Sequence, residues 1–99
     1  MNRFKGNGLY LLDEPEAALS PNGQLAVLLR IHELVEGGSQ FVIATHSPII
    51  LAYPHAHIYQ LDEEAGISEI EYTQTEHYLV TRSFLNDHHR MLHRILKAD

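Results

Sequence analysis

The sequence contains no cysteine, few basic residues and no long apolar run. Without cysteine, neither a disulfide framework nor a thiolate metal site can form, and the composition suits the reducing cytoplasm. No apolar run approaches the roughly 20 residues of a membrane-spanning helix, so we expect neither membrane insertion nor export. The 13 acidic against 7 basic residues, a formal net charge of -6, disfavour nonspecific attraction to nucleic acid or anionic membranes.

The first half of the chain has the pattern of a strand, a helix and a second strand. Residues 9–12 form an unbroken apolar run, which is typical of a parallel strand buried on both faces. Ser20 and Pro21 predict a capped helix start, and the glycine pair at 37–38 predicts its end. Residues 40–44 supply the second buried strand. The crossover is long enough for a right-handed parallel unit, so the fold class is α/β.

The second half predicts a hairpin followed by helices. Apolar and polar residues alternate over 57–61 and 67–72, around a turn at 62–66, and we expect this antiparallel hairpin at the edge of the sheet. From Thr75 onward the apolar residues follow helical spacing, with Asn86 as the expected cap between two short helices.

Polar residues follow both predicted strands directly. Asp13 and Glu14 follow the first, and His46 follows the second, where Ser47 and Pro48 can also cap a short helix. The carboxyl ends of parallel strands meet at one edge, where open α/β sheets bind ligands, so we expect His46 near the two carboxylates. Phosphoryl transfer needs a metal and a group that orients water, and such a pair can supply both. A solvated strand end is the alternative interpretation of the carboxylates alone.

These two segments carry a resemblance to a known family. Residues 9–15, LYLLDEP, resemble the Walker B motif of ABC-type ATPases, and residues 44–47, ATHS, resemble their switch-histidine loop. The resemblance implies that Asp13 helps to hold magnesium, that Glu14 is the catalytic glutamate and that His46 contacts the γ-phosphate of ATP. The context of Glu16 and the closing segment 75–85 resemble predicted stand-alone bacterial AAA or ABC-like ATPases, rather than transporter subunits. The resemblance therefore implies a partial P-loop NTPase fold of the ABC type.

Ser20 occupies the place of the family's D-loop end, where aspartate is usual. The resemblance makes it a candidate cofactor-binding residue beside Asp13, whereas its position before Pro21 favours a plain helix cap.

The first half of that family's domain has no counterpart in the sequence. The phosphate-binding pattern G-x-x-x-x-G-K-[ST] is absent, as is the signature motif, and neither Lys5 nor Lys97 lies in such a context. We therefore expect residues 1–99 to form a single partial domain, the C-terminal half of an ABC-type ATPase, inactive alone and completed by a missing N-terminal half or a second protomer. The alternative is a non-enzymatic module that binds a partner or itself through an open sheet edge.

The histidines and the basic C-terminal segment give weaker signals. His89 and His93 are four residues apart, and His55 and His57 are two apart, but neither pair has a third ligand nearby, so a polar surface is the simpler interpretation of both. Four basic residues near the end allow a phosphate or nucleic-acid contact or an ordinary solvated helix face, and no recognised nucleic-acid motif selects the former. These residues are Arg82, Arg90, Arg94 and Lys97.

Overall fold

The chain divides into two compact units, Met1–Ala56 and His57–Asp99. The computed structural model describes residues 8–96. Among these residues, no helix combines the length and apolar character needed to cross a membrane.

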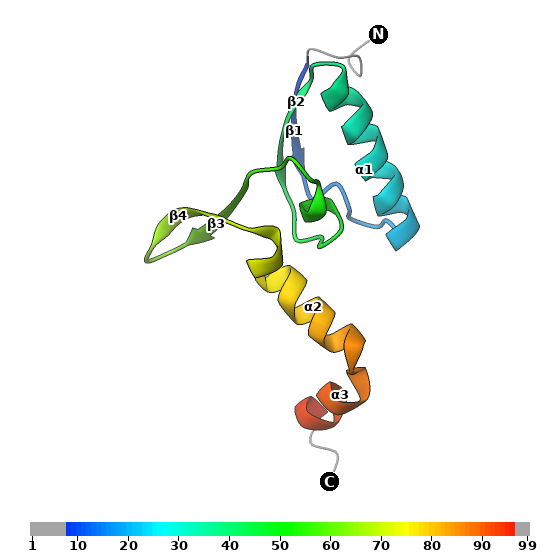
Figure 1. Cartoon of the computed structure of the whole chain (residues 1–99), viewed down its shortest axis with the longest axis vertical. Coiled ribbons are helices and arrows are strands. Elements are labelled where there is room, and N and C mark those ends of the chain that lie inside the picture. Colours follow the sequence, from blue (N-terminus) through cyan, green and yellow to red (C-terminus); the bar gives the residue numbers. More distant parts are fainter. Residues whose placement is uncertain (1–7, 97–99) are drawn as a thin grey trace. The chain divides into compact units, whose positions relative to one another are not determined.

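The first unit is a strand, a helix and a parallel strand, as the sequence predicts (Figure 1). β1 (Leu9–Asp13) pairs in parallel with β2 (Gln40–Ala44), from Leu9 opposite Gln40 to Asp13 opposite Ala44. α1 (Pro21–Glu36) connects the strands, and a short 3-10 turn, η1 (Ile50–Ala52), follows β2. The expected short helix after Ser47 is thus a single 3-10 turn.

Both ends of α1 lie where the sequence places them. The Ser20 hydroxyl accepts a hydrogen bond from the Gly23 N–H at 3.1 Å, which satisfies one of the unpaired amides of the first turn. At the other end, Gly37 donates to the carbonyls of Glu33 and Leu34, and Gly38 has a φ of 100°. Glycine adopts that backbone conformation without steric cost, so the chain can leave the helix and enter β2.

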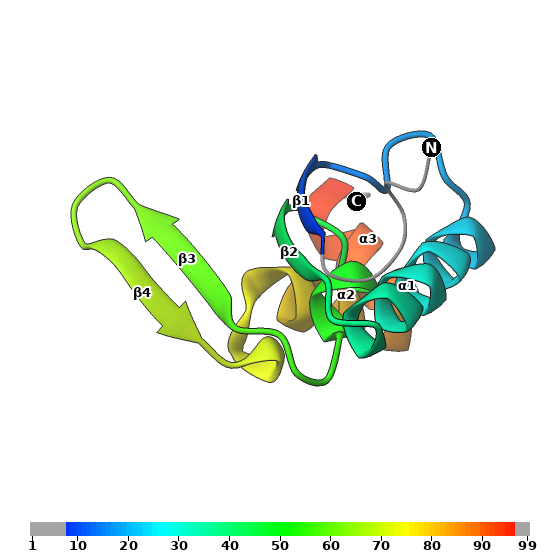
Figure 2. The same cartoon turned by 90° about the horizontal axis from the view of Figure 1, so that it is seen from above.

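α1 lies along the β1–β2 sheet in both views (Figures 1 and 2). The best-buried apolar residues are Ile31 and Leu34 of α1 and Ile50 of η1. On the strands, Tyr10 and Phe41 are partly buried, and their rings stack with centroids 4.9 Å apart. The core of this unit therefore lies between α1, one face of the sheet and η1.

The other face of the β1–β2 sheet corrects the prediction of strands buried on both faces. Leu9, Leu11 and Val42 are 64, 73 and 56 % exposed in the part of the chain that the structure describes. An unbroken apolar run is typical of a strand covered on both sides. Here α1 covers one side, and the alternate side chains face outward.

The second unit begins with an antiparallel hairpin, visible in Figure 2. β3 (Ile58–Asp62) pairs with β4 (Gly66–Ile70), from Ile58 opposite Ile70 to Asp62 opposite Gly66. In the turn, Asp62 Oδ1 accepts hydrogen bonds from the N–H groups of Ala65 at 3.0 Å and Glu64 at 2.7 Å. These bonds lower the pKa of the Asp62 carboxyl.

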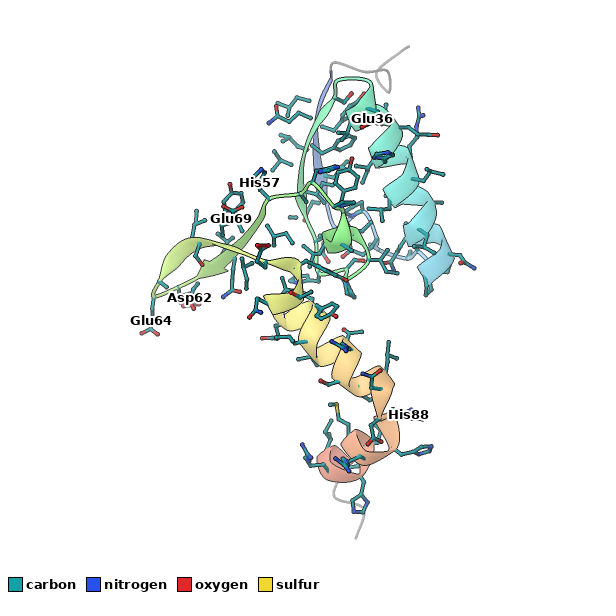
Figure 3. The ribbon with its side chains drawn as sticks, in the orientation of Figure 1. Glu36, His57, Asp62, Glu64, Glu69 and His88 are labelled. Atoms are coloured by element: carbon teal, nitrogen blue, oxygen red, sulfur yellow. The ribbon has the colours of Figure 1, made fainter. Side chains whose placement is uncertain are left out.

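The hairpin is not an edge of the parallel sheet, and that expectation was wrong. Within residues 8–96, β3 and β4 form a two-stranded sheet of their own. The alternation of apolar and polar residues specifies which side chains share a face and how the two strands pair, but it does not specify a third strand. Figure 3 shows His57 and Glu69 side by side at the base of this hairpin, with His57 Nδ1 2.9 Å from Glu69 Oε2.

The rest of this unit is helical. A 3-10 turn, η2 (Tyr72–Gln74), leads into α2 (Glu76–Asn86) and α3 (His88–Leu96). The Thr75 hydroxyl caps α2 by accepting from the Tyr78 N–H at 3.1 Å. The expected cap at Asn86 is wrong by one residue, because Asp87 Oδ1 accepts from the Arg90 N–H at 3.3 Å and so caps α3. A carboxylate is an equally good cap, and here it is Asp87 that precedes the helix.

Candidate functional site

Asp13 and Glu14 lie at the carboxyl end of the parallel sheet, beside the loop that carries His46. Asp13 is the last residue of β1 and lies opposite Ala44, the last residue of β2. The pairing extends one residue further, because the Glu14 N–H donates to the Ala44 carbonyl at 2.7 Å. Asp13, Glu14 and His46 are all exposed. The two polar strand ends therefore meet at one edge, as the strand order predicts.

The loop after β1 has an unusual backbone. Glu14 has a φ of 48° and Ala18 a φ of 66°, and these are the non-glycine residues with positive φ among residues 8–96. For residues other than glycine this conformation costs on the order of 1 kcal/mol or more, and such residues cluster at functional sites. Hydrogen bonds close the loop on itself, from the Ala17 N–H to the Glu14 carbonyl and from the Leu19 N–H to the Glu16 carbonyl. Glu14 thus leaves β1 at a sharp bend that its own loop stabilises.

Glu16 joins this loop to the loop after β2. Thr45 donates its hydroxyl hydrogen to Glu16 Oε1 at 2.6 Å, and the His46 N–H lies 3.2 Å from Glu16 Oε2. Partial burial alone would raise the pKa of Glu16, but the bonds from Thr45 and His46 and the attraction of His46 outweigh it, so the pKa lies below its ordinary value of 4.5. Glu16 is therefore a carboxylate held ionised by the neighbouring loop.

A second set of contacts joins the His46 loop to α1. Thr45 Oγ1 accepts from the Ser47 N–H at 3.0 Å, and Ser47 Oγ accepts from the N–H groups of Ile49 and Ile50, both at 3.1 Å. The Ser47 hydroxyl also donates to Gln24 Oε1 in the second turn of α1. Ser47 is 4 % exposed, so these bonds lie in a largely water-free environment. The loop that carries His46 is thus attached on both sides.

Sequence reasoning missed Glu16, Thr45 and Gln24 as members of the site. In the sequence, Glu16 contributes to the family resemblance but carries no predicted role in the site. A usable signal was the pairing of a carboxylate after one strand with a threonine after its parallel neighbour, since both strand ends lie at the same edge.

A known family matches the first half of the chain. The sequence model of a family described as "AAA domain, putative AbiEii toxin, Type IV TA system" matches residues 3–52. The matched segment is half of the chain and includes Asp13, Glu14, Glu16, Ser20 and His46. The chain belongs to this AAA domain family. Membership indicates a nucleotide-binding, ATPase-like domain of the P-loop NTPase class, with which the parallel α/β unit is compatible. No solved structure matches the chain.

AAA domains generally bind ATP with magnesium, and the strand-end residues of this AAA domain suit that ion. Magnesium takes oxygen ligands and is held in nucleotide sites by one or two carboxylates together with phosphate oxygens and water. Asp13 and Glu14 present exposed carboxylates at the edge of the sheet, and neither side chain forms an ion pair with another residue in 8–96. Glu16, in contrast, already uses both oxygens as acceptors. The donor set therefore fits magnesium at Asp13, with Glu14 beside it.

Ser20 is the helix cap of α1, as its position before Pro21 favours. Its hydroxyl accepts from Gly23, and the side chain is exposed at the end of the loop that begins with Glu14. The cofactor-binding role that the resemblance implies for Ser20 stays a prediction.

The remaining candidate residues do not form a metal centre. In the described part of the chain, no three His, Asp or Glu side chains come together as metal ligands do. His57 contacts Glu69, the rings of His88 and His89 lie 4.3 Å apart, and His32 Nδ1 lies 2.9 Å from the Tyr53 hydroxyl. Of the basic residues, Arg82 contacts Tyr78 and Arg90 pairs with Asp87, while Lys97 lies outside the described residues.

Proposed function

We propose that the chain supplies the magnesium and water-activating residues of an ABC-type ATPase site. The observation that supports this most directly is the bond from the Glu14 N–H to the Ala44 carbonyl, which places Asp13 and Glu14 beside the loop of His46. Two exposed carboxylates and a histidine on adjacent parallel strand ends are the residue types that phosphoryl transfer uses. Membership of the AAA domain family supports the ATPase part of this proposal.

Each residue has a separate role in this proposal. Asp13 would help to hold magnesium, which would supply positive charge to stabilise the transferring phosphoryl group. Glu14 accepts a hydrogen bond from water and orients it as a general base, which an exposed carboxylate beyond the strand end can do. His46 donates a hydrogen bond to the terminal phosphate of ATP. In this proposal Ser20 keeps the following helix in place rather than contacting nucleotide.

In this proposal, the phosphate-binding loop comes from another segment or another protomer. The chain contains no glycine-rich loop with lysine, so the backbone amides that hold nucleotide phosphates must come from elsewhere. We further propose that residues 1–99 correspond to the C-terminal half of such a domain. The cysteine-free composition fits work in the cytoplasm.

Metal binding can be tested on the chain by itself. Manganese is a paramagnetic substitute for magnesium, and amide signals close to bound manganese broaden in ¹H–¹⁵N spectra. We expect selective broadening at Asp13 and Glu14, and its loss in Asp13→Asn. Asp62→Asn, which removes a carboxylate at the hairpin turn, is the control and leaves that broadening unchanged. Broadening that is indifferent to Asp13→Asn would contradict the proposed metal site.

Nucleotide turnover tests the rest. Calorimetry with ATP and a magnesium-dependent hydrolysis assay on the chain alone are expected to show neither binding nor turnover, because the sequence has no phosphate-binding loop. If the chain alone hydrolyses ATP and Glu14→Gln abolishes this activity, the phosphate-binding loop is dispensable. In a reconstituted complete site, Glu14→Gln is expected to slow hydrolysis by about 10²-fold or more, the usual contribution of a general base.

A second candidate function rests on a different observation. β1 and β2 pair only with each other within residues 8–96, and their outer face exposes Leu9, Leu11 and Val42. Unpaired strand edges and an exposed apolar face are typical of surfaces that bind a partner or a second copy. Sedimentation velocity tests this candidate: concentration-dependent dimers that Leu11→Glu abolishes support a self-associating module, and a monomer at all concentrations argues against it.

A further inference from the structure

The side chain of Glu16 directly connects the two loops of the proposed site. Its two oxygens accept hydrogen bonds from consecutive residues of the other loop, Oε1 from the Thr45 hydroxyl and Oε2 from the His46 N–H. Its own carbonyl accepts from the Leu19 N–H within the Glu14 loop. One residue is therefore attached both to the turn that follows Glu14 and to the backbone of His46.

The direction of each hydrogen bond follows from the chemistry. An ionised carboxylate only accepts, so Thr45 must donate its single hydroxyl hydrogen to Glu16. The Thr45 oxygen is then left as an acceptor, and the Ser47 N–H lies 3.0 Å from it. Two consecutive amides are thereby hydrogen-bonded: the His46 N–H to Glu16 and the Ser47 N–H to Thr45. Bonds to an ionised carboxylate are stronger than those between neutral groups.

We propose that Glu16 is a positioning residue for His46, holding the histidine loop in register with Glu14. This inference rests on the proposed function, because it assigns no chemistry to Glu16 itself. With the His46 N–H held by Glu16 in the loop that follows Glu14, the imidazole extends from a fixed backbone position. Preorganisation of this kind is what catalytic groups require from the residues that surround them.

If Glu16 only stabilised the fold in general, its substitution would give a different experimental result from that of a positioning residue. Glu16→Gln keeps the size and shape of the side chain, and its amide oxygen can still accept from Thr45. With the oxygen on Thr45, the amide nitrogen cannot accept from the His46 N–H; in the flipped amide the His46 N–H meets a neutral oxygen instead of a carboxylate. In both orientations the charge-assisted bond to the His46 N–H is lost. Thr45→Ser keeps the hydroxyl donor, and Thr45→Val removes it with little change of volume. A positioning role predicts faster amide exchange confined to residues 45–47, whereas a general stabilising role predicts faster exchange throughout β2.

The test uses ¹⁵N-labelled full-length chain and solvent exchange of individual amides at neutral pH. In Glu16→Gln we expect the His46 amide to exchange about tenfold faster, the factor for one lost bond to a charged group at an exposed site, and its proton signal to move upfield. Glu33→Gln is the matched control, because Glu33 is an exposed α1 residue that contacts Arg30. It leaves His46 unchanged. Thr45→Val also accelerates exchange at His46 and Ser47, and Thr45→Ser does not.

Either of two results would overturn the inference: an unchanged His46 amide in Glu16→Gln, or acceleration spread evenly over residues 40–47. Adding manganese to the same samples separates this inference from the proposed function. If Asp13 and Glu14 do not broaden, the metal site fails, while the exchange data still decide whether Glu16 holds the His46 backbone. If they broaden in both forms and only the His46 amide responds to Glu16→Gln, both proposals are supported.

Discussion

Replacing Ser47 with alanine removes the most buried hydroxyl of the candidate site. Its oxygen accepts from the N–H groups of Ile49 and Ile50, and its hydrogen is donated to Gln24 of α1. Ile50 is one of the best-buried apolar residues, at 4 % exposed, so water cannot readily replace the lost acceptor at its amide. Ser47→Ala therefore disturbs the turn that leads into η1, the attachment of this loop to α1 and the surroundings of a buried residue.

The magnitude follows from these contacts. Loss of a serine hydroxyl that accepts from amides of the following turn costs about 1 kcal/mol, by comparison with a helix cap, and a buried donor left without an acceptor costs roughly another 1–3 kcal/mol. The two overlap here, since one oxygen serves both purposes, so we expect a loss of about 2 kcal/mol. With a urea m value of about 1–3 kcal/mol/M for a small protein, the unfolding midpoint falls by roughly 1 M.

Ser20→Ala is the matched comparison for this prediction. It is the same substitution in the same unit, at the cap of α1, but Ser20 is exposed and accepts from Gly23. We expect a cost of about 0.5–1 kcal/mol, because water can replace the lost acceptor. Urea unfolding followed by circular dichroism measures both variants. If Ser47→Ala costs no more than Ser20→Ala, the argument from buried contacts is refuted.

Three further predictions concern the backbone, the charge of the site and a helix cap. Ala18→Gly, at a φ of 66°, is expected to raise the free energy of unfolding by up to about 1 kcal/mol, whereas Ala26→Gly within α1 lowers it by about 1 kcal/mol, as measured by urea unfolding. The pKa of Glu16 is lower in the folded chain than its ordinary value of 4.5, so the carboxylate stabilises the fold fully above pH 4.5 and loses this effect as the pH falls through the folded-state pKa. The difference in free energy of unfolding between the wild type and Glu16→Gln should therefore shrink from pH 6 to pH 3. A constant difference would refute this. Asp87→Ala should lower the helical circular dichroism signal more than Asn86→Ala, because the Asp87 carboxylate accepts from the Arg90 N–H in the first turn of α3. Equal effects of the two substitutions would argue against Asp87 as the cap.

Much of the first unit could be predicted from the sequence, because its signals are local. The apolar run at 9–12, the cap at Ser20 and the glycines at 37–38 each act on the residues next to them, and together they predict a strand, a helix and a parallel strand. Placing His46 at the same edge as Asp13 then needs only the rule that parallel strands end together. The structure has all these features.

The parts that could not be predicted depend on contacts between distant residues. Glu16 and Thr45 are 29 residues apart, and their bond requires a particular bend at Glu14 that no local pattern specifies. The exposed outer face of β1 has the same origin, because an apolar run predicts burial without saying what covers it. The prediction of an edge position for the hairpin failed because alternation determines pairing within the two strands and no further.

The three carboxylates of residues 13–16 differ in a way that bears on function. Glu16 is satisfied: both of its oxygens accept hydrogen bonds, and its pKa is lowered accordingly. Asp13 and Glu14 are exposed and form no ion pair within residues 8–96, and Glu14 also occupies a strained backbone conformation. A fold selected for stability alone has no reason to keep that strain, since glycine at this position would relieve it. Glu14→Gly should therefore stabilise the chain, or leave its stability unchanged, while removing the proposed water-activating carboxylate. A large loss of stability in Glu14→Gly would instead make the bend at Glu14 a purely structural feature.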